Sequence, residues 1–450
     1  MKRKLIGRIV LLAGLLAGGA VLHAQEVDGT YSAFSPYSIY GVGDISKGTT
    51  SFNASMAGVG VATRDNRFVN VVNPAAVTAR DSLSVMADVS LAEKNNYFSQ
   101  GGINSSNNIF NFNNFVISFP VYRRYLDVYL GIKPYSSVGY NVSHPITDPA
   151  FIGTTGNVTY TSRGNGSVNS LYLGAGSQLT RHLSVGVEGI YYFGKLNKAT
   201  AMSFSNTSFR TINSGHELSL RGVTLKVGAQ MDIPMGEMST MTVGATYKLG
   251  TKISGYNKDY LIATISSASD TVRYNRDNLR DYKDRVKFAD ELGVGVSMRG
   301  SDKWSVEVDY IRSNAGPCGY SSVVGFKNES ETVKFSSGVS QSVRVGASYV
   351  PNRNDIRYYM RRVAYRAGAY WDQAYYKVNG NNVNSYGITL GASFPTTSVN
   401  NPRGSRNHIN VAVDLGQRGT KDNNLIRERF INFTVGVNIF DIWFIKPKYD

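Results

Sequence analysis

Long runs of the sequence alternate apolar and polar residues with a period of two, and this pattern constrains the fold more than any other feature. In one run, Val306, Val308 and Tyr310 alternate with Glu307 and Asp309. Successive side chains of a β-strand point to opposite faces, so such a run predicts a strand with one apolar and one polar face. No comparable stretch has the apolar spacing of three and four that an amphipathic helix requires. The pattern predicts an all-β protein.

Fourteen segments carry this pattern. They lie near residues 82–92, 109–119, 125–140, 168–179, 183–197, 216–232, 239–255, 284–299, 303–316, 337–351, 361–375, 385–397, 405–416 and 428–439. Their connections alternate between short ones, such as 180–182, and long ones, such as 256–283. An even strand number with short periplasmic turns and long extracellular loops is typical of outer-membrane barrels. We therefore predict a 14-stranded antiparallel transmembrane β-barrel over residues 82–440.

The composition excludes several other classes of protein. Only 18% of the residues are charged, whereas soluble domains have about a quarter. Cys318 is the single cysteine, which excludes a disulfide scaffold. No apolar run after residue 25 approaches the roughly 20 residues that a spanning helix needs. The formal charge is +16, but the basic residues form no helix-sized cluster, so no nucleic-acid partner is expected.

The N-terminus has the pattern of a signal peptide. Basic residues within 2–8 precede an apolar run over 9–22, and Ala24 before Gln25 fits a cleavage point. We predict a signal peptide over residues 1–24, with an uncleaved membrane anchor as the alternative. Export combined with a barrel places the protein in the cell outer membrane of a Gram-negative bacterium.

Residues 25–81 precede the first predicted strand. They are rich in Gly, Ser and Asn but contain the apolar anchors Phe34, Tyr37, Tyr40, Phe52, Met56 and Phe68. A disordered tail would have fewer such anchors. A segment of this size can fold back into a barrel lumen. We predict an N-terminal hatch or plug, with a periplasmic extension as the alternative, and a short C-terminal periplasmic tail over residues 441–450.

Part of this N-terminal segment resembles a family signature. A small-residue stretch over 54–62 is followed by an acidic residue and then by an Asn-Pro-Ala sequence. The matching residues are Gly58, Gly60, Asp65, Asn73, Pro74 and Ala75. The pattern resembles the signature of the FadL-type outer-membrane transporters, a superfamily that includes TodX-like hydrocarbon channels and PorV-like secretion proteins. Residues 35–44 and 443–448 are similar to a Bacteroidetes branch of it. Ala76 departs from the pattern, because the family usually has Gly there.

The resemblance implies that these residues belong to a hatch that closes the lumen. Their chemistry is consistent with a rigid turn. Pro74 fixes its own φ and disfavours a helical Asn73, whose side chain can then bond nearby backbone. An ordinary strand-initiating turn is the alternative for Asn-Pro alone.

Pro134 lies inside the third predicted strand. Proline donates no ladder hydrogen bond, so within a sheet it marks an edge, an end or a bulge. FadL-type barrels have an inward kink in their third strand, which opens a lateral path from the lumen to the bilayer. The resemblance therefore implies a kink or gate at Lys133, Pro134 and Tyr135. The alternative is that the strand ends at Lys133.

No residue pattern indicates catalysis. The five histidines show no metal-ligand spacing, and no Gly-x-Ser-x-Gly elbow occurs. We expect no enzyme activity, no cofactor and no metal. The resemblance implies an outer-membrane channel for passive uptake of hydrophobic or amphipathic small molecules, such as long-chain fatty acids, through the lumen and a lateral opening.

The main alternative is a PorV-like barrel that acts as a scaffold or shuttle partner in protein secretion. A soluble periplasmic β protein is a third interpretation. The polar character of connections such as 101–108 favours transport. The expected partners of a monomeric protein of this kind are outer-membrane lipids and lipopolysaccharide, a hydrophobic small-molecule ligand and the barrel-assembly machinery.

Overall fold

A computed structural model describes most of the chain as one unit. The described residues are 34–81, 83–122, 125–147, 149, 152, 155–265, 268–281, 286–327, 333–396, 406–423 and 425–443. The predicted signal peptide, the first residues of the predicted hatch and most of the predicted C-terminal tail lie outside them.

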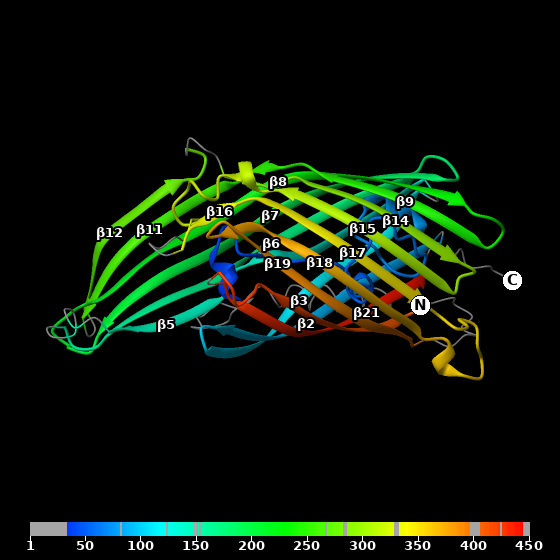
Figure 1. Cartoon of the computed structure of the whole chain (residues 1–450). Coiled ribbons are helices and arrows are strands. Elements are labelled where there is room, and N and C mark those ends of the chain that lie inside the picture. Colours follow the sequence, from blue (N-terminus) through cyan, green and yellow to red (C-terminus); the bar gives the residue numbers. More distant parts are fainter. Residues whose placement is uncertain are drawn as a thin grey trace, which may run out of the picture. The chain divides into compact units, whose positions relative to one another are not determined.

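The described strands form a closed 14-stranded antiparallel barrel, as the sequence predicts (Figure 1). The wall is built from β2 (Ser84–Gln100), β3 (Ile103–Tyr122), β4 (Leu126–Ser137), β5 (Tyr140–Ile146), β6 (Val158–Gln178), β7 (Leu183–Phe204), β8 (Thr211–Pro234), β9 (Ser239–Lys248), β11 (Ser254–Ile265), β12 (Ala268–Asn278), β14 (Glu291–Gly300), β15 (Trp304–Asn314), β16 (Phe335–Ser337), β17 (Val339–Tyr349), β18 (Ala364–Val378), β19 (Asn381–Pro395), β20 (His408–Arg418) and β21 (Arg427–Ile442). Four barrel strands are interrupted, so that two elements form each: β4 with β5, β9 with β11, β12 with β14, and β16 with β17. The barrel closes where β2 pairs with β21, from Ser84 opposite Ile442 to Ser99 opposite Arg427.

Smaller elements lie between and before these strands. They are η2 (Pro36–Ile39), β1 (Asp44–Ile45), α2 (Ser51–Ala54), η3 (Pro74–Ala79), β10 (Thr251–Lys252), β13 (Lys287–Phe288), η4 (Gly316–Cys318) and η5 (Tyr359–Arg361). No helix among the described residues is long and apolar enough to span a membrane.

The period-two pattern separates the two faces of the wall. On β15, Val306 and Val308 are exposed on the outside, whereas Glu307 and Asp309 are buried on the inside. The same arrangement on the other strands produces an apolar outer band, in which Val223 of β8 is 64% exposed. An exposed apolar band of this extent is suited to the hydrocarbon region of a bilayer.

Several predicted long loops are in fact strand. The connection predicted over 256–283 is mostly β11 and β12, and the one predicted over 93–108 is a β2–β3 hairpin that turns at Gly101 and Gly102. Beyond the apolar band both faces of a strand meet water, so the alternation of apolar and polar residues disappears although the pairing continues. Sequence periodicity therefore underestimates these strands.

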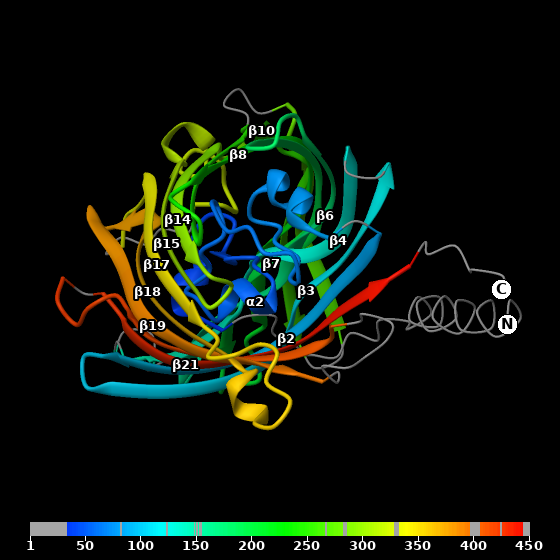
Figure 2. The same ribbon diagram turned by 90° about the vertical axis from the view of Figure 1, so that its right-hand side faces the viewer.

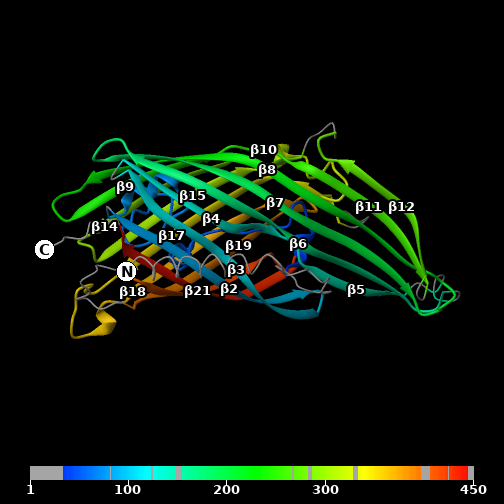
Figure 3. The same cartoon turned by 180° about the vertical axis from the view of Figure 1, so that it is seen from behind.

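The extended strands form a sheet beyond the barrel on one side (Figure 3). It contains β5, the first part of β6, the last part of β7, the first part of β8, β11 and β12, paired in this order. Within the described residues, β12 pairs only with β11 and β5 only with β6. The sheet therefore has two unpaired edges. It lies at the end of the barrel opposite the short turns.

Candidate functional site

Residues 34–81, called the N-terminal segment below, run inside the barrel (Figure 2). Phe52, Met56, Val59 and Phe68 form a buried apolar cluster within it. The rings of Phe52 and Phe68 stack with their centroids 4.6 Å apart. The segment thus has a small core of its own, and some of its backbone N–H groups, such as those of Gly60 and Ala57, bond to side chains of the wall.

A belt of inward-facing glycines lets the N-terminal segment lie directly against the wall. It consists of Gly176, Gly186, Gly228, Gly244, Gly346, Gly368, Gly391 and Gly436, which come from eight different strands. A Cβ atom on Gly186 would lie 2.6 Å from the backbone N of Ala75, and one on Gly368 would lie 2.7 Å from the backbone N of Ala57. Real Cβ atoms do not approach other atoms this closely. Larger residues at the glycine belt would therefore displace the segment.

The Asn-Pro-Ala residues sit against this glycine belt. Asn73 Oδ1 accepts a hydrogen bond from the backbone N–H of Ala75 (3.0 Å), and its Nδ2 donates to Val61 O (2.7 Å). Pro74 begins the short helix η3, where its missing N–H has no consequence. The Asn73 side chain thereby joins the turn to the small-residue stretch.

The small-residue stretch is held by two carboxylates of β15. Asp309 Oδ2 accepts hydrogen bonds from the backbone N–H groups of Gly60 (2.7 Å) and Val61 (3.0 Å). Glu307 Oε1 accepts from the N–H of Ala62 (2.8 Å), and Glu307 Oε2 from the hydroxyl of Thr63. A Cβ on Gly60 would lie 2.6 Å from Val72, so glycine is required for this approach.

Gly58 and Asp65 have contacts that support the conformation of the N-terminal segment. Gly58 has φ +80°, a conformation that favours glycine, and its carbonyl oxygen accepts from Arg344 Nη1 (3.2 Å). Asp65 accepts from the backbone N–H of Arg67 (2.8 Å). Burial alone would raise the pKa of Asp65, but Arg353 and Arg67 outweigh it and hold the pKa below its ordinary value. Neither Asp65 nor the Asn-Pro-Ala residues line the cavity described next.

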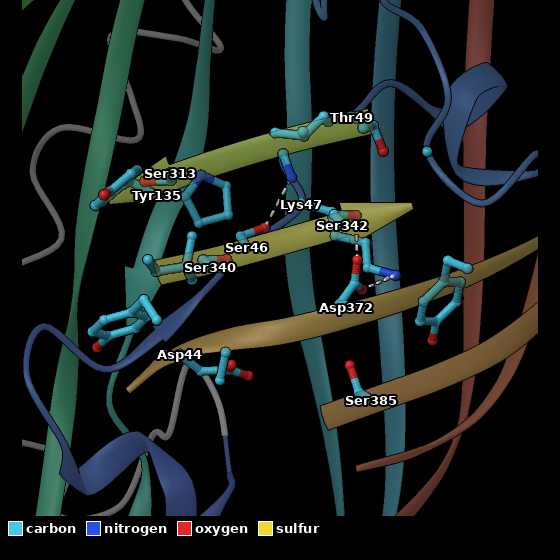
Figure 4. Close-up of a pocket in the computed structure, with 18 of the residues that line it drawn as sticks. Asp44, Ser46, Lys47, Thr49, Tyr135, Ser313, Ser340, Ser342, Asp372 and Ser385 are labelled. Atoms are coloured by element: carbon cyan, nitrogen blue, oxygen red, sulfur yellow. Dashed lines mark hydrogen bonds and ion pairs between the residues drawn. The ribbon is translucent and has the colours of Figure 1, made fainter. Parts of the chain in front are cut away.

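A cavity of about 400 Å³ lies between the N-terminal segment and the wall (Figure 4). Its charged lining residues are Asp44, Lys47, Lys94, Lys133, Glu188, Lys226, Lys248, Glu291, Arg344, Asp372, Asp414, Arg418 and Glu428. Many are paired: Lys47 with Asp372 (3.2 Å), and Lys248 with Glu291 (3.0 Å). The lining of this lumen cavity therefore combines paired charges with aromatic and aliphatic side chains such as Tyr135, Tyr192 and Ile311.

The third barrel strand is interrupted beside the lumen cavity. β4 pairs with β3 only as far as Ile132, opposite Phe115. Beyond this point β4 continues through Pro134, with a register shift between Pro134 and Ser136 in its pairing with β6. The alternative that the strand ends at Lys133 is therefore wrong, because β4 continues to Ser137. Pro134 fits into β4 because β3 no longer pairs with β4 at this position. Ser136 and Ser137 pair instead with β1 of the N-terminal segment.

The three residues named from the sequence meet at this interruption and line the lumen cavity. Lys133 Nζ donates to Gly48 O (3.1 Å). The ring of Tyr135 packs against Tyr192, with centroids 4.6 Å apart. The first part of β3, residues 103–114, pairs with β2 and with no other strand of the described chain. The wall is consequently not hydrogen-bonded between β3 and β5.

An apolar cluster of buried side chains lies beside the lumen cavity. Tyr40, Tyr320, Phe326 and Tyr375 are buried in it. The N–H of Gly41 donates to Phe326 O (3.0 Å), which ties the N-terminal segment to the loop after β15.

The carboxylates Glu307 and Asp309, the arginine Arg344 and the glycine belt were not identified from the sequence. A charged residue at an inward position of a strand was the only signal for Glu307, Asp309 and Arg344. No group of His, Cys, Asp or Glu residues suited to a metal ion occurs in the described part of the chain.

Comparison with known proteins places this fold. The CymD monoaromatic hydrocarbon channel is 13% identical, with a TM-score of 0.53 over 87% of this chain and 97% of that chain. The Ralstonia pickettii toluene transporter TbuX is 13% identical, with a TM-score of 0.55 over 87% and 97%. A Pseudomonas aeruginosa FadL homologue is 10% identical, with a TM-score of 0.55 over 90% and 99%. A comparison with curated proteins gave no match.

The closed barrel, its apolar outer band and its occupied lumen define a transmembrane β-barrel of the FadL-type fold. The family model described as BamG matches residues 1–450, so the chain belongs to the BamG family.

Proposed function

We propose that this protein is an outer-membrane channel that passes amphipathic small molecules by passive diffusion. The observation that carries the proposal is the lumen cavity beside the interrupted pairing of β3 and β4. Proteins of the same fold are described as a monoaromatic hydrocarbon channel and a toluene transporter. In this proposal, the N-terminal segment acts as the hatch, and the ligand leaves laterally past Lys133, Pro134 and Tyr135.

The lining of the lumen cavity, which carries both paired charges and apolar side chains, favours an amphiphile over a pure hydrocarbon. Transfer of apolar surface into a cavity lined by paired charges would separate or desolvate those charges. A carboxylate head, as in a long-chain fatty acid, can instead bind near Lys133, whose Nζ donates to the backbone carbonyl of Gly48. The apolar part of the ligand would then lie along the unpaired β3 edge towards the bilayer.

The first test is mass spectrometry of lipid extracts from protein purified in mild detergent. Ser385 lines the lumen cavity, so Ser385→Trp fills it, whereas Ser385→Ala keeps the backbone and the space. We expect an amphiphile enriched on the wild type and on Ser385→Ala, and reduced about tenfold on Ser385→Trp, since a filled cavity excludes it. Equal enrichment on the tryptophan variant would contradict binding in the lumen cavity.

A separate test addresses the lateral route. Pro134→Ala supplies an N–H and removes the restriction on φ, so the strand can regain regular pairing. We expect ligand uptake by cells to fall severalfold while binding of the amphiphile to purified protein is kept. Unchanged uptake would count against a gate at Pro134.

The second candidate is a PorV-like barrel that acts as a scaffold or shuttle partner in protein secretion. The extended sheet with unpaired edges at β5 and β12 favours it, because such edges can pair with strands of another chain. Absence of an enriched amphiphile, together with a stoichiometric co-purifying protein, would favour this candidate over the channel.

A further inference from the structure

The outer wall carries a groove, whose lining shares only Tyr370 and Phe430 with that of the lumen cavity. It has a volume of about 960 Å³ and lies over β19, β20 and β21, beside the β2–β3 hairpin. Its lining is predominantly apolar and aromatic, and it includes Arg427 and Arg429 but no acidic residue. The lumen mechanism proposed above does not use it.

Three rows of outward-facing residues cross the strands in the groove. The row farthest from the β2–β3 hairpin is apolar, with Ile388 opposite Leu415 and Leu415 opposite Ile431. These three side chains are exposed and continue the apolar outer band. A bilayer would cover them with acyl chains.

The next row contains the groups that suit a membrane interface. Tyr386 lies opposite Gln417, Gln417 opposite Arg429, and Arg429 opposite Tyr97. Tyr386 is 53% exposed and Tyr97 56% exposed. Tyrosines with a polar tip and an apolar ring are typical of this boundary.

The third row supplies a second cation. Arg427 lies opposite Ser99 of β2, two residues above Arg429 on the same face of β21. Its Nε is buried and has no hydrogen-bond partner within the described chain. Arg429 Nε donates only to the neutral Gln417 Oε1 (3.3 Å). Two guanidinium groups thus lie above an apolar surface without a carboxylate in the groove to neutralise them.

The position of the groove specifies one leaflet. The short turns lie at the barrel end where Ser84 pairs with Ile442, and the groove is near the opposite end, where β2 and β3 form their hairpin. Short turns are periplasmic in outer-membrane barrels, so the groove faces the outer leaflet. The lipid of that leaflet that combines phosphates with several acyl chains is a phosphorylated glycolipid.

We propose that this groove binds a phosphorylated glycolipid of the outer leaflet, with its phosphate at Arg427 and Arg429 and an acyl chain along Ile388, Leu415 and Ile431. Guanidinium groups bind phosphate by charge-assisted, bidentate hydrogen bonds. The apolar row contributes by burying acyl surface. The site would hold a lipid of the outer leaflet against the outward face of β19, β20 and β21.

Native mass spectrometry of the full-length protein in mild detergent tests the proposal, with purified lipid A as the added probe. Arg221 is the matched control, because it is an exposed arginine of β8 just above the outward-facing Val223 and does not line the groove. We expect the Arg427→Gln/Arg429→Gln variant to lose about tenfold in lipid A occupancy, because two charge-assisted bonds are removed. Arg221→Gln is expected to bind like the wild type.

A second variant separates the groove from general surface charge. Ser106→Trp places a large ring in the groove and keeps both arginines. We expect it to reduce lipid A occupancy as well. Equal occupancy in the double arginine variant and the wild type, an equal loss in Arg221→Gln, or equally tight binding of phosphatidylglycerol would overturn the proposal.

Discussion

Gly186→Val is expected to displace the N-terminal segment and open the lumen. The first added carbon would lie 2.6 Å from the backbone N of Ala75, and the rest of the valine side chain would extend into Pro74. Neither partner is a flexible side-chain end, so the segment rather than a rotamer must move. Overpacking of this kind costs about 1–3 kcal/mol or more, and here it acts directly on the contact between segment and wall.

The measurement is swelling of liposomes that contain the purified protein, with a small sugar as the permeant. We expect Gly186→Val to swell severalfold faster than the wild type. Gly189→Val is the control, because a Cβ at Gly189 of the same strand has no atom closer than 3.9 Å. Equal swelling of the two variants would show that the glycine belt does not hold the segment in place. Heat-modified mobility in gels verifies that both variants are folded.

Asp309→Ala is expected to weaken the contact between the N-terminal segment and the wall, because it removes hydrogen bonds. The carboxylate accepts from the N–H groups of both Gly60 and Val61, which are buried. Its removal leaves two buried donors without their acceptor, at about 1–3 kcal/mol for each. We expect a clearly lower Tm in detergent and faster liposome swelling.

Asp414→Ala provides the matched control. Asp414 also faces the lumen, but it accepts from Tyr370 Oη (2.9 Å) and Asn432 Nδ2 (3.4 Å), both of which belong to the wall. Its loss should change the Tm without increasing swelling. If Asp414→Ala increased swelling as much as Asp309→Ala, the effect would come from general loosening of the barrel and not from release of the N-terminal segment.

The strands of the barrel were predictable where one face meets lipid and the other meets the lumen. Val306 and Val308 alternate with Glu307 and Asp309 because the two faces of β15 have different surroundings. β11 and β12 were predicted as a loop because both of their faces meet water, so residues such as Asp259 and Arg273 carry no periodicity. Their pairing is nevertheless regular apart from one register shift.

The candidate site was predictable only in part. Asn73 and Pro74 were identifiable because a turn is a local structure, formed by residues adjacent in the chain. Pro134 marked an irregular position, but the course of the strand beyond it depends on where β3 and β6 run. Asp309 gave no local signal, because an inward-facing carboxylate looks the same in the sequence whether it meets water or a buried N–H group.

The sequence by itself determined the strand class, the number of strands and which residues face outwards, since each depends on neighbours a few positions away. Only the tertiary structure decided what fills the lumen. Gly60 and Asp309 are 249 positions apart, and the glycine belt is assembled from eight strands. Contacts of this kind depend on closure of the barrel around the N-terminal segment, which no local pattern of residues records.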